Sequence, residues 1–182
     1  MPITLSKEFL DLLHEIVLEN DPETASGYMY EGMVQGSIDR AMRRIYRKEP
    51  FPSILDKAAA LLFSIAYFHP FSDGNKRTAL LATYFFLAFN GFNFSLTVDA
   101  IKFLIRIGDG QIKSETIVMN WLKKHTQKNY LARLFMRLTG LATKDIVITP
   151  NMAERKFMSG SSVMDIAIHL LEFSRKLWPT KK

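Results

Sequence analysis

Cysteine is absent from the 182-residue chain. Disulfides, zinc thiolate sites and cysteine nucleophiles are therefore excluded. The absence fits a cytoplasmic protein, because disulfides are uncommon in that reducing compartment, and we expect that location. Residues 1–20 show no basic start followed by an apolar run, so we expect no secretory signal.

Long apolar runs and closely spaced histidines are also missing. The longest apolar run is bounded by Arg77 and Asn90, and it is shorter than the roughly 20 residues that span a bilayer. We therefore expect a buried core helix there and no membrane partner. Three of the four histidines, His14, His125 and His169, lack metal-ligand spacing. We expect those three at the surface or in an interface.

Hydrophobic residues, in contrast, are plentiful at 48% of the chain. They suffice for the core of one compact domain, or of one domain with an appendage. The net charge is +6, which suits a phosphate-bearing or acidic partner; charge alone favours a solvated surface. The clearest local concentration of positive charge is Arg43, Arg44, Arg47 and Lys48.

Apolar residues recur at helical spacing, and no alternating strands of convincing length occur. The fold class is therefore all-α, a bundle of six to eight helices. Helices are expected at 9–17, 37–46, 53–68, 75–89, 97–108 and 114–127, with Ile45 and Ile117 facing inward, and in an extension at 130–141 and 162–177. We expect a loop or short hairpin at 47–52 and a short strand or link at 146–148. The domain boundary is placed between 1–128 and 129–182.

The start of the helix expected at Asn75 combines several features of an anion site. Its first backbone N–H groups have no partners within the helix, and with the helix dipole they attract an anion. Gly74 removes a side chain where a phosphate would approach and permits a positive φ. Lys76 and Arg77 add two cations where the dipole favours acids. An anion bound among them would explain this placement.

The preceding loop supplies a base and a carboxylate. His69 has a reference pKa of about 6.5, which suits proton removal from a hydroxyl near neutral pH. Asp73 suits Mg²⁺ if nucleotide phosphates complete the ligand set. Phe71 is apolar in a polar loop, so we expect it to enter the core. Each residue alone is typical of an ordinary helix end or turn; their convergence favours a site. It is not a P-loop, because the required earlier glycine is missing.

The segment His69-Pro-Phe-Ser-Asp-Gly-Asn-Lys-Arg-Thr-Ala-Leu80 resembles the signature of the Fic/Doc superfamily. The common pattern is H-P-F-x-D/E-G-N-G-R-x-x-R, and the form with N-K-R-T-A is similar to the Doc, or death-on-curing, branch. The resemblance in organisation extends over about residues 32–124 and does not cover the chain after about 128. It implies a helical bundle with the motif helix at its centre.

The resemblance also implies a role for each motif residue. His69 would be the general base that deprotonates a Ser, Thr or Tyr hydroxyl of a target protein. Asp73 would coordinate Mg²⁺ bound to ATP. The residues expected to contact the nucleotide are Phe71, Gly74, Asn75, Lys76 and Arg77, of which Arg77 also acts in catalysis by neutralising phosphate charge. A flap at about 46–52 would align the target backbone by strand pairing.

Two chemistries stay open, because the motif mixes features. Lys76 and Leu80 replace the second glycine and last arginine of the common pattern, as in Doc, which transfers the γ-phosphate. Gly74 follows the Fic pattern, whose enzymes transfer AMP. We favour phosphate transfer, since Lys76 adds bulk and charge where an α-phosphate would need a close backbone approach. A catalytically silent binding module for nucleic acid or protein is the alternative from another class.

Regulation and assembly are less defined. Doc-type toxins are restrained by an antitoxin, so the resemblance implies an antitoxin as well as a target protein, and nucleic acid is not an expected partner. The nearest match to the inhibitory motif of Fic proteins, S/T-x-x-x-E-G/N, is Gly27 to Gly32, which lacks the hydroxyl residue. The segment 129–182 could pack on the body or form a homodimer contact.

Overall fold

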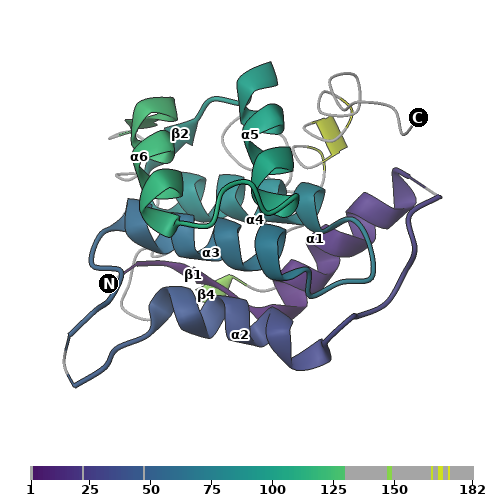
Figure 1. Ribbon diagram of the computed structural model, residues 1–182, viewed down its shortest axis with the longest axis horizontal. Helices are drawn as coiled ribbons and strands as arrows, with labels where there is room; N and C mark the ends of the chain where they lie inside the picture. The colour runs from purple at the N-terminus through teal and green to yellow at the C-terminus, as the bar shows by residue number, and fades with distance from the viewer. Residues whose placement is uncertain are drawn as a thin grey trace.

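The computed structural model describes residues 2–21, 23–46, 48–129 and 147–148, together with Asp165, Ile168, His169 and Glu172. These residues form a mainly helical body, which confirms the expected fold class (Figure 1). The elements in chain order are β1 (Thr4–Leu5), α1 (Lys7–Glu19), α2 (Glu31–Met42), α3 (Ile54–Phe68), α4 (Asn75–Phe89), β2 (Phe92–Phe94), α5 (Val98–Gly108), α6 (Glu115–His125), β3 (Thr126–Lys128) and β4 (Val147–Ile148).

Helices α3 and α4 form the centre of the body. In Figure 1, α5 and α6 lie on one side of this pair and α2 lies on the other. Helix α4 packs against α1, α3, α5 and β2. It is buried around most of its circumference from Thr78 to Phe89, as its all-round apolar sequence predicts. The motif residues at its start are thereby joined to a helix that is buried in the core.

The bounds of α3 and α4 follow from local sequence. Ser53 and Asp56 make a capping box at the start of α3, with each side chain accepting a hydrogen bond from the other's backbone N–H. Helix α4 begins after Gly74 and stops at Asn90-Gly91, where Gly91 has a φ of 80°. Both helices therefore match the sequence prediction.

Helix α2 lies earlier in the chain than predicted. The helix expected at 37–46 runs instead from Glu31 to Met42. Ile45, expected to face the core, is 39% exposed and pairs with Lys48 across a reverse turn. The prediction was wrong because the apolar residue after the helix belongs to a hairpin and does not continue the helical face.

The end of α6 also differs from the prediction. The helix expected to reach Gln127 stops at His125, and Thr126–Lys128 form β3, antiparallel to β2. A strand of three residues is too short to show an alternating pattern, so the sequence could not reveal it. Ile117 was predicted to face inward but is 51% exposed, whereas Val118 and Leu122 are buried.

Part of the C-terminal extension contacts the N-terminus of the body. Val147 and Ile148 form a strand parallel to β1, with Thr4 opposite Val147. Of the two alternatives expected at 146–148, a short strand or a link, the structure has the strand. The described residues between 165 and 172 are helical, as predicted, whereas the helix expected at 130–141 lies outside the described residues. No helix in the described ranges is long and apolar enough to cross a membrane.

Candidate active site

His69 lies at the C-terminal end of α3 in an unusual backbone conformation. Its φ is 51° and its ψ is 63°, the left-handed region that few non-glycine residues adopt. The side chain is half-buried. Burial lowers the pKa of His69, and the positive charge of Lys76 lowers it further, against opposing effects of a hydrogen bond with the backbone of Ala66 and of the charge of Asp109. The imidazole is therefore neutral at pH 7 and able to accept a proton.

Asn75 holds the loop from His69 to Gly74 in shape. Its Oδ1 accepts a hydrogen bond from the backbone N–H of Phe71 at 2.9 Å, and its Nδ2 donates to the carbonyl of Phe71 at 2.8 Å. The side chain is buried, at 7% exposure. A side-chain amide supplies both a donor and an acceptor to one residue. Asn75 therefore shapes the loop from within, in addition to any contact with a ligand.

Replacing Asn75 by Asp should destabilise the fold by about 1–3 kcal/mol, because the carboxylate cannot donate to the buried carbonyl of Phe71. Urea denaturation measures the change in the free energy of unfolding. Asn93→Asp is the matched control, since Asn93 is exposed and, among the described residues, its side chain accepts a hydrogen bond from Asn129 through Oδ1 and donates none. Equal losses in both variants would contradict the role given to Asn75.

Phe71 enters the core, as predicted, and is 1% exposed. Its ring stacks on the imidazole of His14, with centroids 3.9 Å apart, and on the ring of Tyr28, with centroids 5.7 Å apart. Nδ1 of His14 lies 3.0 Å from Oγ1 of Thr78 in α4. His14 thus connects α1 to both the motif loop and the motif helix.

The position of His14 corrects the sequence prediction. Expected at the surface or in an interface, it is 5% exposed. Burial lowers its pKa to about 4, with weaker effects from the charges of Asp11, Arg77 and Asp73. Spacing along α1 could not distinguish His14 from a surface residue, because the residue that covers it, Phe71, lies far away in sequence.

Gly74 has the positive φ that the sequence predicted, 72°. A Cβ at this position would lie 3.1 Å from Cγ1 of Val17 and 3.2 Å from Cε1 of His14. The glycine therefore also permits close packing against α1, a reason that the sequence did not reveal. The turn at Gly74 sets where α4 begins, and the first backbone N–H groups of the helix have no partners within it.

Asp73 lies directly before the helix start. Its Oδ1 accepts a hydrogen bond from the backbone N–H of Gly74 at 2.6 Å. The described residues contain no group of three or more histidine and acidic side chains that could hold a metal. A single carboxylate at this place could hold Mg²⁺ if phosphate oxygens and waters complete the shell of the ion.

Both motif cations pair with carboxylates from outside the motif. Nη1 of Arg77 is 2.6 Å from Oδ2 of Asp21, and its Nη2 donates to Oγ1 of Thr24 at 2.8 Å. Nζ of Lys76 is 3.0 Å from Oδ1 of Asp109. Sequence reasoning missed both acids. Each stands in a turn, where a lone acidic residue carries no signal of function.

The segment before α2 runs beside the motif loop. Tyr28 and Phe71 form an antiparallel bridge, and Ser72 donates its backbone N–H to the carbonyl of Gly27 at 2.9 Å. Glu31, the acid in the weak inhibitory match, is exposed at the first turn of α2. The carboxylate placed against Arg77 is that of Asp21.

A short hairpin follows α2, as predicted, but it begins at Ile45 and not at residue 47. Ile45 and Lys48 exchange two backbone hydrogen bonds of 2.8 Å, and Tyr46 between them has a φ of 47° and is 97% exposed. Pro50 and Pro52 come after this bridge and remove no bond from it.

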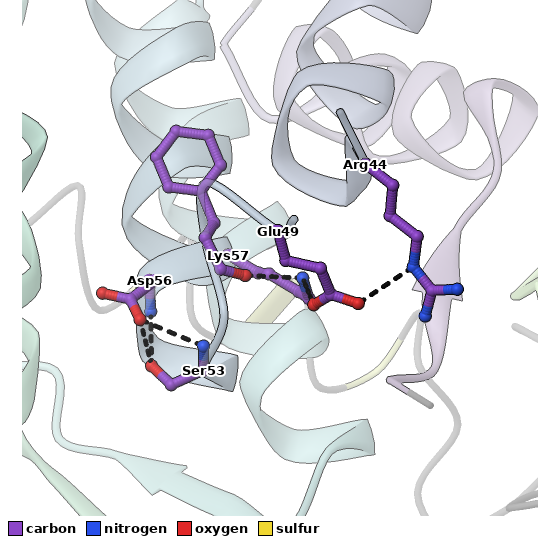
Figure 2. A network of polar contacts seen from close by, with 6 residues as sticks. Arg44, Glu49, Ser53, Asp56 and Lys57 are labelled. Atoms are coloured by element: carbon purple, nitrogen blue, oxygen red, sulfur yellow. Dashed lines mark hydrogen bonds and ion pairs between the residues drawn. The ribbon is translucent and has the colours of Figure 1, made fainter. Parts of the chain in front are cut away.

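Buried charge anchors the hairpin to α3. Glu49 accepts from Arg44 at 2.9 Å and from Lys57 at 2.8 Å, and Lys57 also donates to the carbonyl of Phe51 (Figure 2). Lys57 is 3% exposed. A buried ammonium must be paired, so this network fixes the base of the hairpin. Of the basic residues concentrated at 43–48, Arg44 therefore already pairs with a carboxylate, that of Glu49.

Sequence comparison relates the motif and the helices around it to known proteins. The model of the Fic/DOC family matches residues 4–87. The matched segment contains the whole motif from His69 to Leu80. Over 68 residues the chain is 40% identical to Toxin Doc of Mycolicibacterium smegmatis. The aligned segment covers 37% of this chain and 52% of that protein. The chain thus spans about half the length of the curated relative that it matches, and the resemblance to the Doc branch is confirmed.

Proposed function

We propose that this protein acts as a member of the Fic/DOC family and transfers the γ-phosphate of ATP to a Ser, Thr or Tyr hydroxyl of a target protein. One observation carries the proposal: a neutral, half-buried imidazole stands at one end of a loop whose other end is a helix N-terminus with a carboxylate and two cations. That arrangement can accept a proton and bind an anion within one short segment.

The reaction follows from these groups. His69 takes the proton of the target hydroxyl as its oxygen forms a bond to the γ-phosphorus, and the bond from that phosphorus to the β-γ bridging oxygen breaks to release ADP. The N-terminus of α4, Lys76 and Arg77 offset the negative charge on the phosphoryl oxygens. When bound with the nucleotide, Mg²⁺ held by Asp73 would neutralise further phosphate charge.

AMP transfer by the same residues is the second candidate, and Gly74 favours it. In that reaction the same proton goes to His69, the bond forms at the α-phosphorus and pyrophosphate leaves. Lys76 favours phosphate transfer, because it puts a long cationic side chain in the first turn of α4. The M. smegmatis relative is named Toxin Doc, and this name supports a toxin role and a separate antitoxin as partner.

Radiolabel transfer distinguishes the candidates. A lysate treated with the protein and either γ-labelled or α-labelled ATP should gain protein-bound label from γ-labelled ATP alone. Label from α-labelled ATP alone would overturn phosphate transfer in favour of AMP transfer. Mass spectrometry of the modified target then identifies the added group. Absence of label from both nucleotides, with salt-sensitive DNA binding, would favour a silent binding module.

A further inference from the structure

The side chain of Lys76 lies across the C-terminal end of α5. Gly108 is the last residue of that helix, and a Cβ there would overlap Cε of Lys76 and lie 3.1 Å from its Cδ and Cγ. The ammonium group is 3.0 Å from Oδ1 of Asp109, the C-cap residue of α5. The lysine stem therefore packs on the glycine while its charge meets the aspartate.

This contact is unsuited to a stabilising role. The side chains of Lys76 and Asp109 are 30% and 45% exposed, and exposed ion pairs add little to stability. The contact instead restricts where the side chain of Lys76 lies, because a free lysine side chain samples many rotamers. The charges of Lys76 and Asp109 also act, with opposite sign, on the ring of His69, the proposed base.

We propose that Gly108 and Asp109 are positioning residues that seat Lys76 at the rim of the candidate site. Gly108 leaves room for the lysine stem, and Asp109 holds its charge, so that the cation is in place before the nucleotide arrives. The inference rests on the proposed function for its consequence in catalysis. Its structural content concerns only where Lys76 lies.

Gly108 and Asp109 together are called the seat of Lys76. Gly108→Ala tests this seat without changing any charge. Gly108 has no left-handed φ, so alanine fits the backbone and favours the helix. The added methyl group takes the space of the Lys76 stem and displaces it. We expect kcat for transfer of label from γ-labelled ATP to the target protein to fall on the order of ten- to a hundredfold. KM for ATP should change little, and Tm should be unchanged or raised. Asp109→Asn should lower kcat in the same way, and Asp109→Glu should restore part of it.

Gly36→Ala is the matched control. Gly36 is also a helical glycine, in α2, and nothing lies within 4 Å of a Cβ added there. Its kcat should equal that of the wild type. In a Lys76→Gln background, Gly108→Ala should cause no further loss of kcat, because the cation that the methyl group would displace has already been removed. A fall of the same size in both backgrounds would overturn the seat, as would wild-type kcat in Gly108→Ala.

An NMR readout separates failure of the seat from failure of the proposed function. The Cε signal of Lys76, assigned by its loss in Lys76→Gln, should differ from that of a free lysine in the wild type. It should move to the free-lysine position in Gly108→Ala and in Asp109→Asn. A Lys76 signal that is the same in all three proteins would overturn the seat even if the protein transfers phosphate. A wild type that transfers no label but shows these shifts would refute the function alone.

Discussion

His69→Ala is expected to reduce label transfer to the target protein by about 10²- to 10⁴-fold, the usual contribution of a positioned general base. The structure places this half-buried imidazole at the end of α3 with its pKa lowered. Without it, no described motif side chain holds a neutral nitrogen that could take the hydroxyl proton. Single-turnover transfer from γ-labelled ATP measures the loss.

His169→Ala is the matched control, because His169 is an exposed helical histidine in the C-terminal extension. That variant should keep wild-type activity, and both variants should keep the wild-type Tm. If His69→Ala modified the target as fast as the wild type, His69 would have no part in the mechanism. A large fall in Tm would instead assign it a structural role.

The lowered pKa of His69 also predicts a pH profile. Only the neutral ring accepts a proton, so the midpoint of the acid-side decline in kcat/KM should lie below about 6.5, the ordinary histidine value. Burial and the charge of Lys76 cause this shift. A midpoint at or above the ordinary value would contradict the environment described for the ring.

The second large effect is a loss of stability in acid caused by His14. Above about pH 6.5 the ring is neutral in both the folded and the unfolded chain, so it contributes no pH dependence. Below that pH the unfolded chain gains a proton that the folded chain refuses until about pH 4. Each pKa unit corresponds to about 1.4 kcal/mol; allowing for screening by solvent near the loop, we expect a loss of about 2 kcal/mol across this window.

His14→Gln isolates this contribution from the other titrating groups. The glutamine does not titrate, so the stability difference between wild type and variant should shrink as the pH falls from 7 to 4.5. Urea denaturation at both pH values measures it. A difference that stays constant would show that the folded protein protonates His14 as readily as the unfolded chain does.

The sequence alone determined most of the local structure. Ser53 and Asp56 set the start of α3, and Gly74 and Gly91 set the ends of α4, because capping and positive φ depend on residues close together in the chain. The motif from His69 to Leu80 likewise identified the candidate site, since its groups converge on one helix start.

Tertiary structure alone decided what surrounds the motif. Phe71 stacks on His14, Arg77 pairs with Asp21, and Lys76 pairs with Asp109. These partners come from α1, from the connection after it and from the end of α5, and neither periodicity nor spacing relates them to the motif. A buried histidine and two turn aspartates look ordinary in a sequence, because their environment exists only once the helices pack. The motif supplies the proposed chemistry, and packing determines the pKa values and positions of the groups that would carry it out.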